Sequence, residues 1–73
     1  MNINWIHTKS DCVDTDIYTF IKSHNTYIIR RIIVLVHNDE RINEFNLSKN
    51  FAHIGSFSTL QKAQKIVELI LEG

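Results

Sequence analysis

The segment from Thr26 to His37 constrains the fold of this chain more than any other part of the sequence. Eight of its residues are apolar, and six of the nine positions from Ile28 to Val36 are β-branched. Their spacing would also fit one face of a helix, but β-branched side chains lose rotamer freedom in a helix and pack well on a strand. We therefore predict a strand. Because its apolar side chains point to both sides, this strand should lie inside a sheet that a helix covers on one face.

A second clear pattern lies near the C-terminus, where the sequence predicts an amphipathic helix from Thr59 to Glu72. Ser58 is the expected N-cap, and Gln61 three positions later would complete a capping box. Apolar residues recur there at the three- and four-residue spacing of one helix face. They are Leu60, Ala63, Val67, Ile70 and Leu71.

Turn-forming residues divide the remainder of the chain into shorter strands. In chain order we predict an edge strand at residues 2–7, a turn at 37–40, a half-exposed strand at 41–47, a turn at 48–50 and a short strand at 51–56. Residues 16–23 allow two interpretations. A run of β-formers from Ile17 to Ile21 favours a strand, whereas aspartates near the start of this segment would also suit the beginning of a helix.

These elements predict one α+β domain over residues 1–73, since a chain of 73 residues holds a single core. The preferred architecture is a three- to four-stranded antiparallel meander with one C-terminal amphipathic helix packed on one face. If residues 11–24 are helical instead, the element order becomes α-β-β-β-α.

Charge and cysteine content narrow the classes of protein. Eight basic and eight acidic residues balance, which argues against a strongly basic DNA-coating protein and against an acidic nucleic-acid mimic. Cys12 is the only cysteine, so an intramolecular disulfide is excluded and a reducing, cytoplasmic location is expected. The longest apolar run, Ile32 to Val36, is far shorter than the ~20 residues that span a bilayer, and Met1 to Thr8 has no signal-peptide pattern. We expect no membrane association.

The residues that could carry catalysis or bind metal are scattered. His7, His24, His37 and His53 are 13 to 17 residues apart, unlike the close ligand pairs of zinc sites. Cys12 stands among aspartates, which would raise rather than lower the pKa of a thiol, and no glycine-rich loop exists to hold phosphates. We therefore expect no enzymatic activity, no metal and no cofactor.

Six residues are candidates for an interaction surface. Arg30 and Arg31 are neighbours on a strand, so one of them must share a face with apolar residues, either in a salt bridge to Glu44 or Glu40 or as part of a contact surface. Trp5 is either a core residue or an exposed interface anchor. The candidate set is Trp5, Tyr18, Lys22, Tyr27, Arg30 and Arg31.

The segment from Ile54 to Glu68 resembles the ending of many small phage and mobile-element proteins, in which a last strand leads through a phenylalanine and a capping Ser or Thr into a helix. The resemblance, which covers about a fifth of the chain, implies a sheet-plus-helix fold of the anti-CRISPR or host-takeover type. It further implies a protein that binds a host protein.

The alternative element order is similar to double-stranded-RNA-binding domains, with Gly55 and Ala63 matching the closing motif of that family. Lys62 and Lys65 only partly replace the consecutive lysines with which that family binds phosphates.

The leading functional hypothesis is a small non-enzymatic protein-binding module, an inhibitor or modulator of a host protein such as a defence system, or a chain that pairs with itself as a homodimer. One helix of about fourteen residues cannot cover both faces of a sheet whose central strand is apolar on both. The alternative is a nucleic-acid-binding domain that uses Lys22, Arg30, Arg31 and Lys49.

Overall fold

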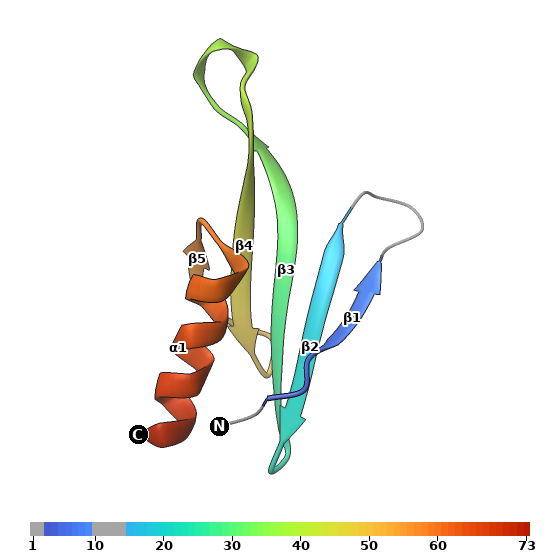
Figure 1. Cartoon of the computed structure of the whole chain (residues 1–73), viewed down its shortest axis with the longest axis vertical. Coiled ribbons are helices and arrows are strands. Elements are labelled where there is room, and N and C mark those ends of the chain that lie inside the picture. The colour runs from blue at the N-terminus through green and yellow to red at the C-terminus, as the bar shows by residue number, and fades with distance from the viewer. Residues whose placement is uncertain (1–2, 10–14) are drawn as a thin grey trace.

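The protein folds as one antiparallel sheet with a helix on one side (Figure 1). The computed structural model describes residues 3–9 and 15–73, apart from the side chain of Asn38. Each strand pairs with its neighbours in the chain, so the sheet order is β1-β2-β3-β4-β5. The elements are β1 Ile6–Lys9, β2 Asp16–Lys22, β3 Asn25–Leu35, the 3-10 helix η1 His37–Asp39, β4 Arg41–Lys49, β5 Ala52–Phe57 and α1 Leu60–Glu72.

The predicted α+β class, the antiparallel meander and the C-terminal helix are confirmed, but the sheet has five strands instead of three or four. The difference arises at the N-terminal side, where β1 pairs with β2 and β2 pairs with β3. Because residues 16–22 form a strand, the α-β-β-β-α order is wrong. Cys12, Asp11 and Asp14, which entered the sequence argument, lie outside the described residues.

Two tight turns join β2 to β3 and β4 to β5. Ser23 and His24 have φ of 52° and 70°, and Asn50 and Phe51 have φ of 51° and 69°. Positive φ at both central residues is the pattern of type I′ turns, whose twist matches that of the flanking strands. The second turn therefore falls at Asn50 and Phe51 rather than at the predicted residues 48–50, and β4 continues to Lys49.

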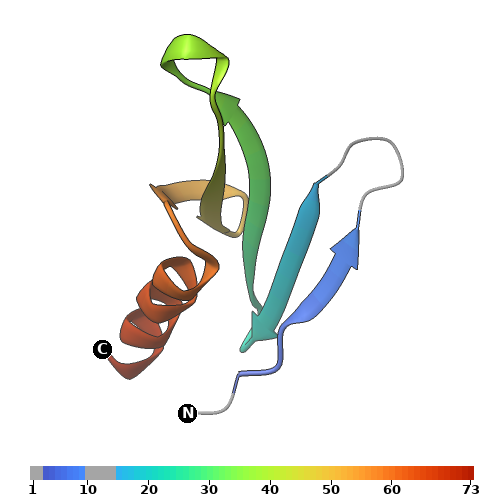
Figure 2. The same cartoon turned by 45° about the horizontal axis from the view of Figure 1, so that its top comes forward.

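The helix α1 packs against β3, β4 and β5 on one side of the sheet (Figure 2). Thr59 rather than Ser58 is its N-cap, because the Thr59 hydroxyl accepts a hydrogen bond from the backbone N–H of Lys62 at 3.1 Å. The Ser58 hydroxyl instead accepts from the Lys62 ammonium at 3.1 Å. Among the described residues, no helix is both long and apolar enough to cross a membrane.

The core lies between α1 and the sheet. Ala63 and Val67 of the helix meet Tyr27, Ile29 and Leu47 of the two central strands, and all five side chains are buried. Aromatic rings pack around this cluster, and those of Trp5 and Phe20 lie 5.6 Å apart. Burying each large apolar side chain contributes about 1.5–3 kcal/mol, so this layer holds the helix on the sheet.

The β3–β4 hairpin extends beyond the rest of the sheet, as the upper part of Figure 1 shows. The last β2 pair in this direction is Asp16 with Arg31, and the last β5 pair is Phe57 with Phe45. Within the described residues, 32–35 and 41–44 therefore pair only with each other. We call residues 32–44 the arm.

Candidate functional site

The strand register assigns every sheet residue to one of two faces. Tyr18, Ile29 and Leu47 stand in one cross-strand row on the face that α1 covers. The opposite face, which we call the open face, consists of the odd-numbered residues of β2, the even-numbered residues of β1, β3 and β4, and His53 and Ser56 of β5. Figure 2 shows α1 on one side of the sheet only.

The open face combines seven apolar residues with nine polar or charged ones. It carries Ile6, Ile17, Ile21, Ile28, Ile32, Val34 and Ile42, which is seven apolar side chains of the kind normally buried. Ile6 and Ile21 are each 63% exposed. An antiparallel sheet with one solvated face normally places polar residues there, so this composition calls for an explanation.

A groove crosses the open face. Its volume is about 470 Å³, and its walls come from β3, β4 and the start of β5. The residues that line it include Ile28, Arg30, Ile32, Asn46, Ser48, Phe51 and His53. Apolar and polar residues contribute equally to this lining, and a concave surface that offers both can bind another molecule.

Phe51 is the most unusual residue of this region. Its side chain is 87% exposed, and its φ of 69° lies in the left-handed region, where a bulky residue is an outlier. A non-glycine residue in that conformation costs about 1–2 kcal/mol. Neither core packing nor backbone preference favours phenylalanine here. Strained residues of this kind gather at functional sites, and exposed aromatic rings are frequent interface anchors.

Arg30 is the one cation of the open face, and Glu44 is the one anion. Neither forms an ion pair with a described residue, and the side chain of Arg30 is exposed. The salt bridge expected from Arg30 or Arg31 to Glu44 or Glu40 is therefore absent from the described part of the chain. Arg31 points to the other face, where it pairs with Asp16.

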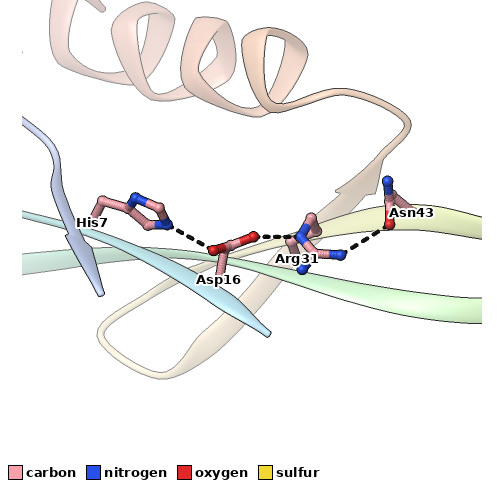
Figure 3. Close-up of polar contacts among 4 residues, drawn as sticks. All are labelled: His7, Asp16, Arg31 and Asn43. Atoms are coloured by element: carbon pink, nitrogen blue, oxygen red, sulfur yellow. Dashed lines mark hydrogen bonds and ion pairs between the residues drawn. The ribbon is translucent and has the colours of Figure 1, made fainter. Parts of the chain in front are cut away.

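A row of polar side chains crosses the helix-covered face and joins four strands (Figure 3). His7 Nε2 lies 2.8 Å from Asp16 Oδ1, and Arg31 Nε donates to Asp16 Oδ2 at 2.6 Å. Arg31 Nη1 also donates to Asn43 Oδ1 at 3.0 Å. The hydrogen bond from His7, followed by that from Arg31, lowers the pKa of Asp16. The carboxylate is thus ionised at neutral pH and accepts hydrogen bonds from β1 and β3 together.

This polar row fits a structural role better than a catalytic one. Both Asp16 oxygens are engaged with neighbouring strands, and the His7 ring stacks on Tyr18 with centroids 4.6 Å apart. Within residues 3–9 and 15–73, no three His, Cys, Asp or Glu side chains stand close enough to hold a metal ion.

The six residues expected to form an interaction surface do not gather on one surface. Tyr27 is only 2% exposed and belongs to the core, because it stands opposite α1 on a central strand. Trp5 and Tyr18 pack against that core, and Arg31 is held in the polar row. Lys22 is exposed at the end of β2. Of the six, Arg30 alone lies on the open face.

The basic residues considered for nucleic-acid binding are also separated. Lys22, Arg31 and Lys49 lie on the helix-covered side of the sheet, and Arg30 lies on the other. The Lys49 ammonium stands 5.9 Å from the centre of the Tyr27 ring. The four cations therefore form no continuous basic patch.

Sequence reasoning missed Phe51 because it assigned this residue to a strand. The available signal was the dipeptide Asn50-Phe51 between two alternating segments, since asparagine favours tight hairpin turns. Comparison with known proteins offers no further guide to the site: no family model matches the sequence, and no curated protein or solved structure matches it.

Proposed function

We propose that this chain is a non-enzymatic protein-binding module and that the open face is its contact surface. The observation that carries the proposal is the set of seven apolar side chains on a sheet face that no described element covers. Contiguous exposed apolar surface on a small protein marks an interaction site, because leaving such surface in water is unfavourable.

The charge of this face favours a protein partner over a nucleic acid. Arg30 is balanced by Glu44 on the same face, and the whole chain has no net charge. Nucleic-acid binding depends on several phosphate contacts from Lys and Arg, which one arginine cannot supply. A groove beside an exposed phenylalanine is, by contrast, suited to apolar side chains of another protein.

The resemblance of residues 54–68 to small phage and mobile-element proteins adds a narrower proposal, namely that the partner is a host protein which the chain inhibits or modulates. The matching residues belong to β5, the cap and α1, where they pack and terminate these elements. They support the kind of fold rather than the choice of partner.

Site-specific photo-crosslinking tests the contact surface. A photoreactive phenylalanine analogue replaces Phe51 on the open-face groove or, as a control, Leu69, which is 51% exposed on α1. We expect irradiation in the producing cells to yield a protein adduct from position 51 and little from position 69. Absence of an adduct at position 51, or equal adducts at both, would contradict the proposal.

A binding titration distinguishes the proposed protein-binding function from the nucleic-acid-binding alternative. The probe is a fluorescent 20-nucleotide DNA or RNA, single- or double-stranded, titrated at two salt concentrations. We expect no binding, and an affinity that falls steeply with salt would instead support the alternative.

A further inference from the structure

We infer that the occupant of the open face is a second copy of this chain, packed face to face about a two-fold axis. This inference rests on the proposed function, since it names the partner of the same surface. A two-fold interface uses one patch twice, so the patch must be complementary to itself. Three properties of the open face meet that requirement.

The first property is shape. Phe51, 87% exposed in the β4–β5 turn, borders a groove of about 470 Å³ on the open face. Phe51 stands at the turn end of β4, and the groove extends along β3 and β4 from Ser48 and Ile28 past Asn46 and Arg30. Consider a two-fold axis that lies between the two sheets, runs perpendicular to the strands and passes over Ile28 and Ser48. This axis seats each Phe51 in the groove of the other copy.

The second property is charge. With this axis the strands of the two copies run antiparallel, so Arg30 of one copy faces the Thr26 end of the other rather than its own counterpart. Arg30 is exposed and lines the groove, so its guanidinium can lie on the incoming Phe51 ring, a favourable cation–π arrangement. The chain carries no net charge, so two copies do not repel one another.

The third property is area. Five strands about 4.8 Å apart and about six residues long at ~3.3 Å each give a face of roughly 24 by 20 Å, or ~480 Å² in projection. Two such faces amount to ~1,000 Å², and accessible surface exceeds its projection. A specific interface buries about 1,000 Å² or more. The five-stranded part of the open face is thus large enough for a stable pair, arranged as two aligned sheets.

Sedimentation equilibrium of the purified full chain tests the inference, with Phe51→Gly as the informative variant. Glycine suits the positive φ at this position, so the variant keeps the fold while it loses the ring. We expect the wild type to be a dimer at micromolar concentration and the variant to dissociate at about 30-fold higher concentration or more, as for an interface anchor. Leu69→Ala removes an apolar side chain that is 51% exposed on α1 and should leave the dimer unchanged.

Site-directed crosslinking then tests the position of the axis. In a Cys12→Ser background, Ser48→Cys places a thiol near its own counterpart, and a short bis-maleimide should link two copies. Ser58→Cys, exposed just before α1, should give no link at the same concentration. A wild type that stays monomeric at high micromolar concentration, equal dissociation by the two apolar variants, or linkage only through position 58 would overturn the inference. If the monomeric chain is nevertheless photo-crosslinked through position 51 to a different protein, the second-copy inference fails while the proposed function stands.

Discussion

Asp16 and Phe51 differ sharply in what their side chains contribute to the folded protein. Asp16 uses both carboxylate oxygens to tie β1 and β3 to β2, through His7 and Arg31. Phe51 contributes almost no buried surface and holds an unfavourable backbone conformation. The first residue stabilises the folded chain, whereas the proposed function assigns the second to contact with a partner.

We expect Asp16→Asn to lower stability in a pH-dependent way. The folded-state pKa of Asp16 lies below the ordinary value of 3.8, because His7 and then Arg31 stabilise the carboxylate. Its contribution is therefore fully present above pH 3.8 and is lost as the pH falls through the lower folded-state pKa. Urea unfolding should give a gap between wild type and variant at neutral pH that narrows in acid.

The matched control for this prediction is Asp39→Asn, which changes an exposed carboxylate in η1. Its effect should be small at every pH, and asparagine tolerates the positive φ of this position. A gap for Asp16→Asn that stays constant into acid would contradict the role given to the ion pair.

Phe51→Gly should leave the isolated monomer as stable as the wild type or raise its free energy of unfolding by up to ~1 kcal/mol, because it relieves the left-handed strain. The neighbouring Asn50→Ala should destabilise by ~1–2 kcal/mol, since the Asn50 side chain accepts from the Thr26 N–H at 2.9 Å and donates to Asn25 at 3.0 Å. Chemical unfolding at a protein concentration below the dissociation constant of the inferred dimer measures the stability of both variants. A clear loss of stability in Phe51→Gly would mean that the ring supports the fold.

Among the elements, α1 is stabilised by packing against the sheet, whereas the arm has little packing beyond its own two strands. The helix is capped by Thr59 and buries Ala63 and Val67 against the two central strands. The arm is a two-stranded hairpin whose Leu35 is 67% exposed. A two-stranded hairpin without further packing is at best marginally stable in water. Stability should therefore decrease along β3 from Ile29 toward Leu35.

Removing the N-cap tests the stability of α1 directly. Thr59→Ala should lower the free energy of unfolding by about 1 kcal/mol, because the backbone N–H of Lys62 loses its acceptor. Ser58→Ala serves as the control, since among residues 3–9 and 15–73 its hydroxyl bonds only to the exposed Lys62 ammonium and should contribute well under half as much. Equal effects in thermal or chemical unfolding would show that the cap is not confined to Thr59.

Amide hydrogen exchange tests the stability of the arm. In the monomer, residues 32–35 and 41–44 should exchange through local opening, whereas Tyr27, Ile29 and Leu47 should exchange only on global unfolding. The arm amides should therefore exchange orders of magnitude faster. Uniform protection along β3 would indicate that the arm is supported by contacts beyond its own hairpin.

For the molecule as a whole, local sequence patterns predicted most elements but few of the contacts between them. The β-branched run and the amphipathic C-terminal segment identify β3 and α1, because each shows its own periodicity. The pairing of Asp16 with Arg31 depends on strand register across 15 residues, which local pattern cannot supply. The exposed position of Phe51 depends on a turn that ends one residue later than predicted, at Phe51 rather than Asn50.

The same patterns predicted a sheet face that the helix leaves uncovered, since one short helix cannot shield both sides of an apolar strand, and no described element covers the open face. The residues that make up the open face were not predicted correctly, because neighbouring strand residues alternate between the two faces of the sheet. Arg30 and Arg31 differ by one position, yet Arg30 lines the groove and Arg31 forms a partly buried ion pair on the other face. Burial of Tyr27 likewise follows from its place under α1 rather than from its residue type.

The central claim is that a protein covers the face opposite α1, and the native size of the chain in an extract of the cells that produce it tests this most directly. Size-exclusion chromatography with immunodetection should find the wild type well above its monomer mass of 8.6 kDa. The Phe51→Gly variant should move toward that mass. Elution of both proteins at 8.6 kDa would contradict the account.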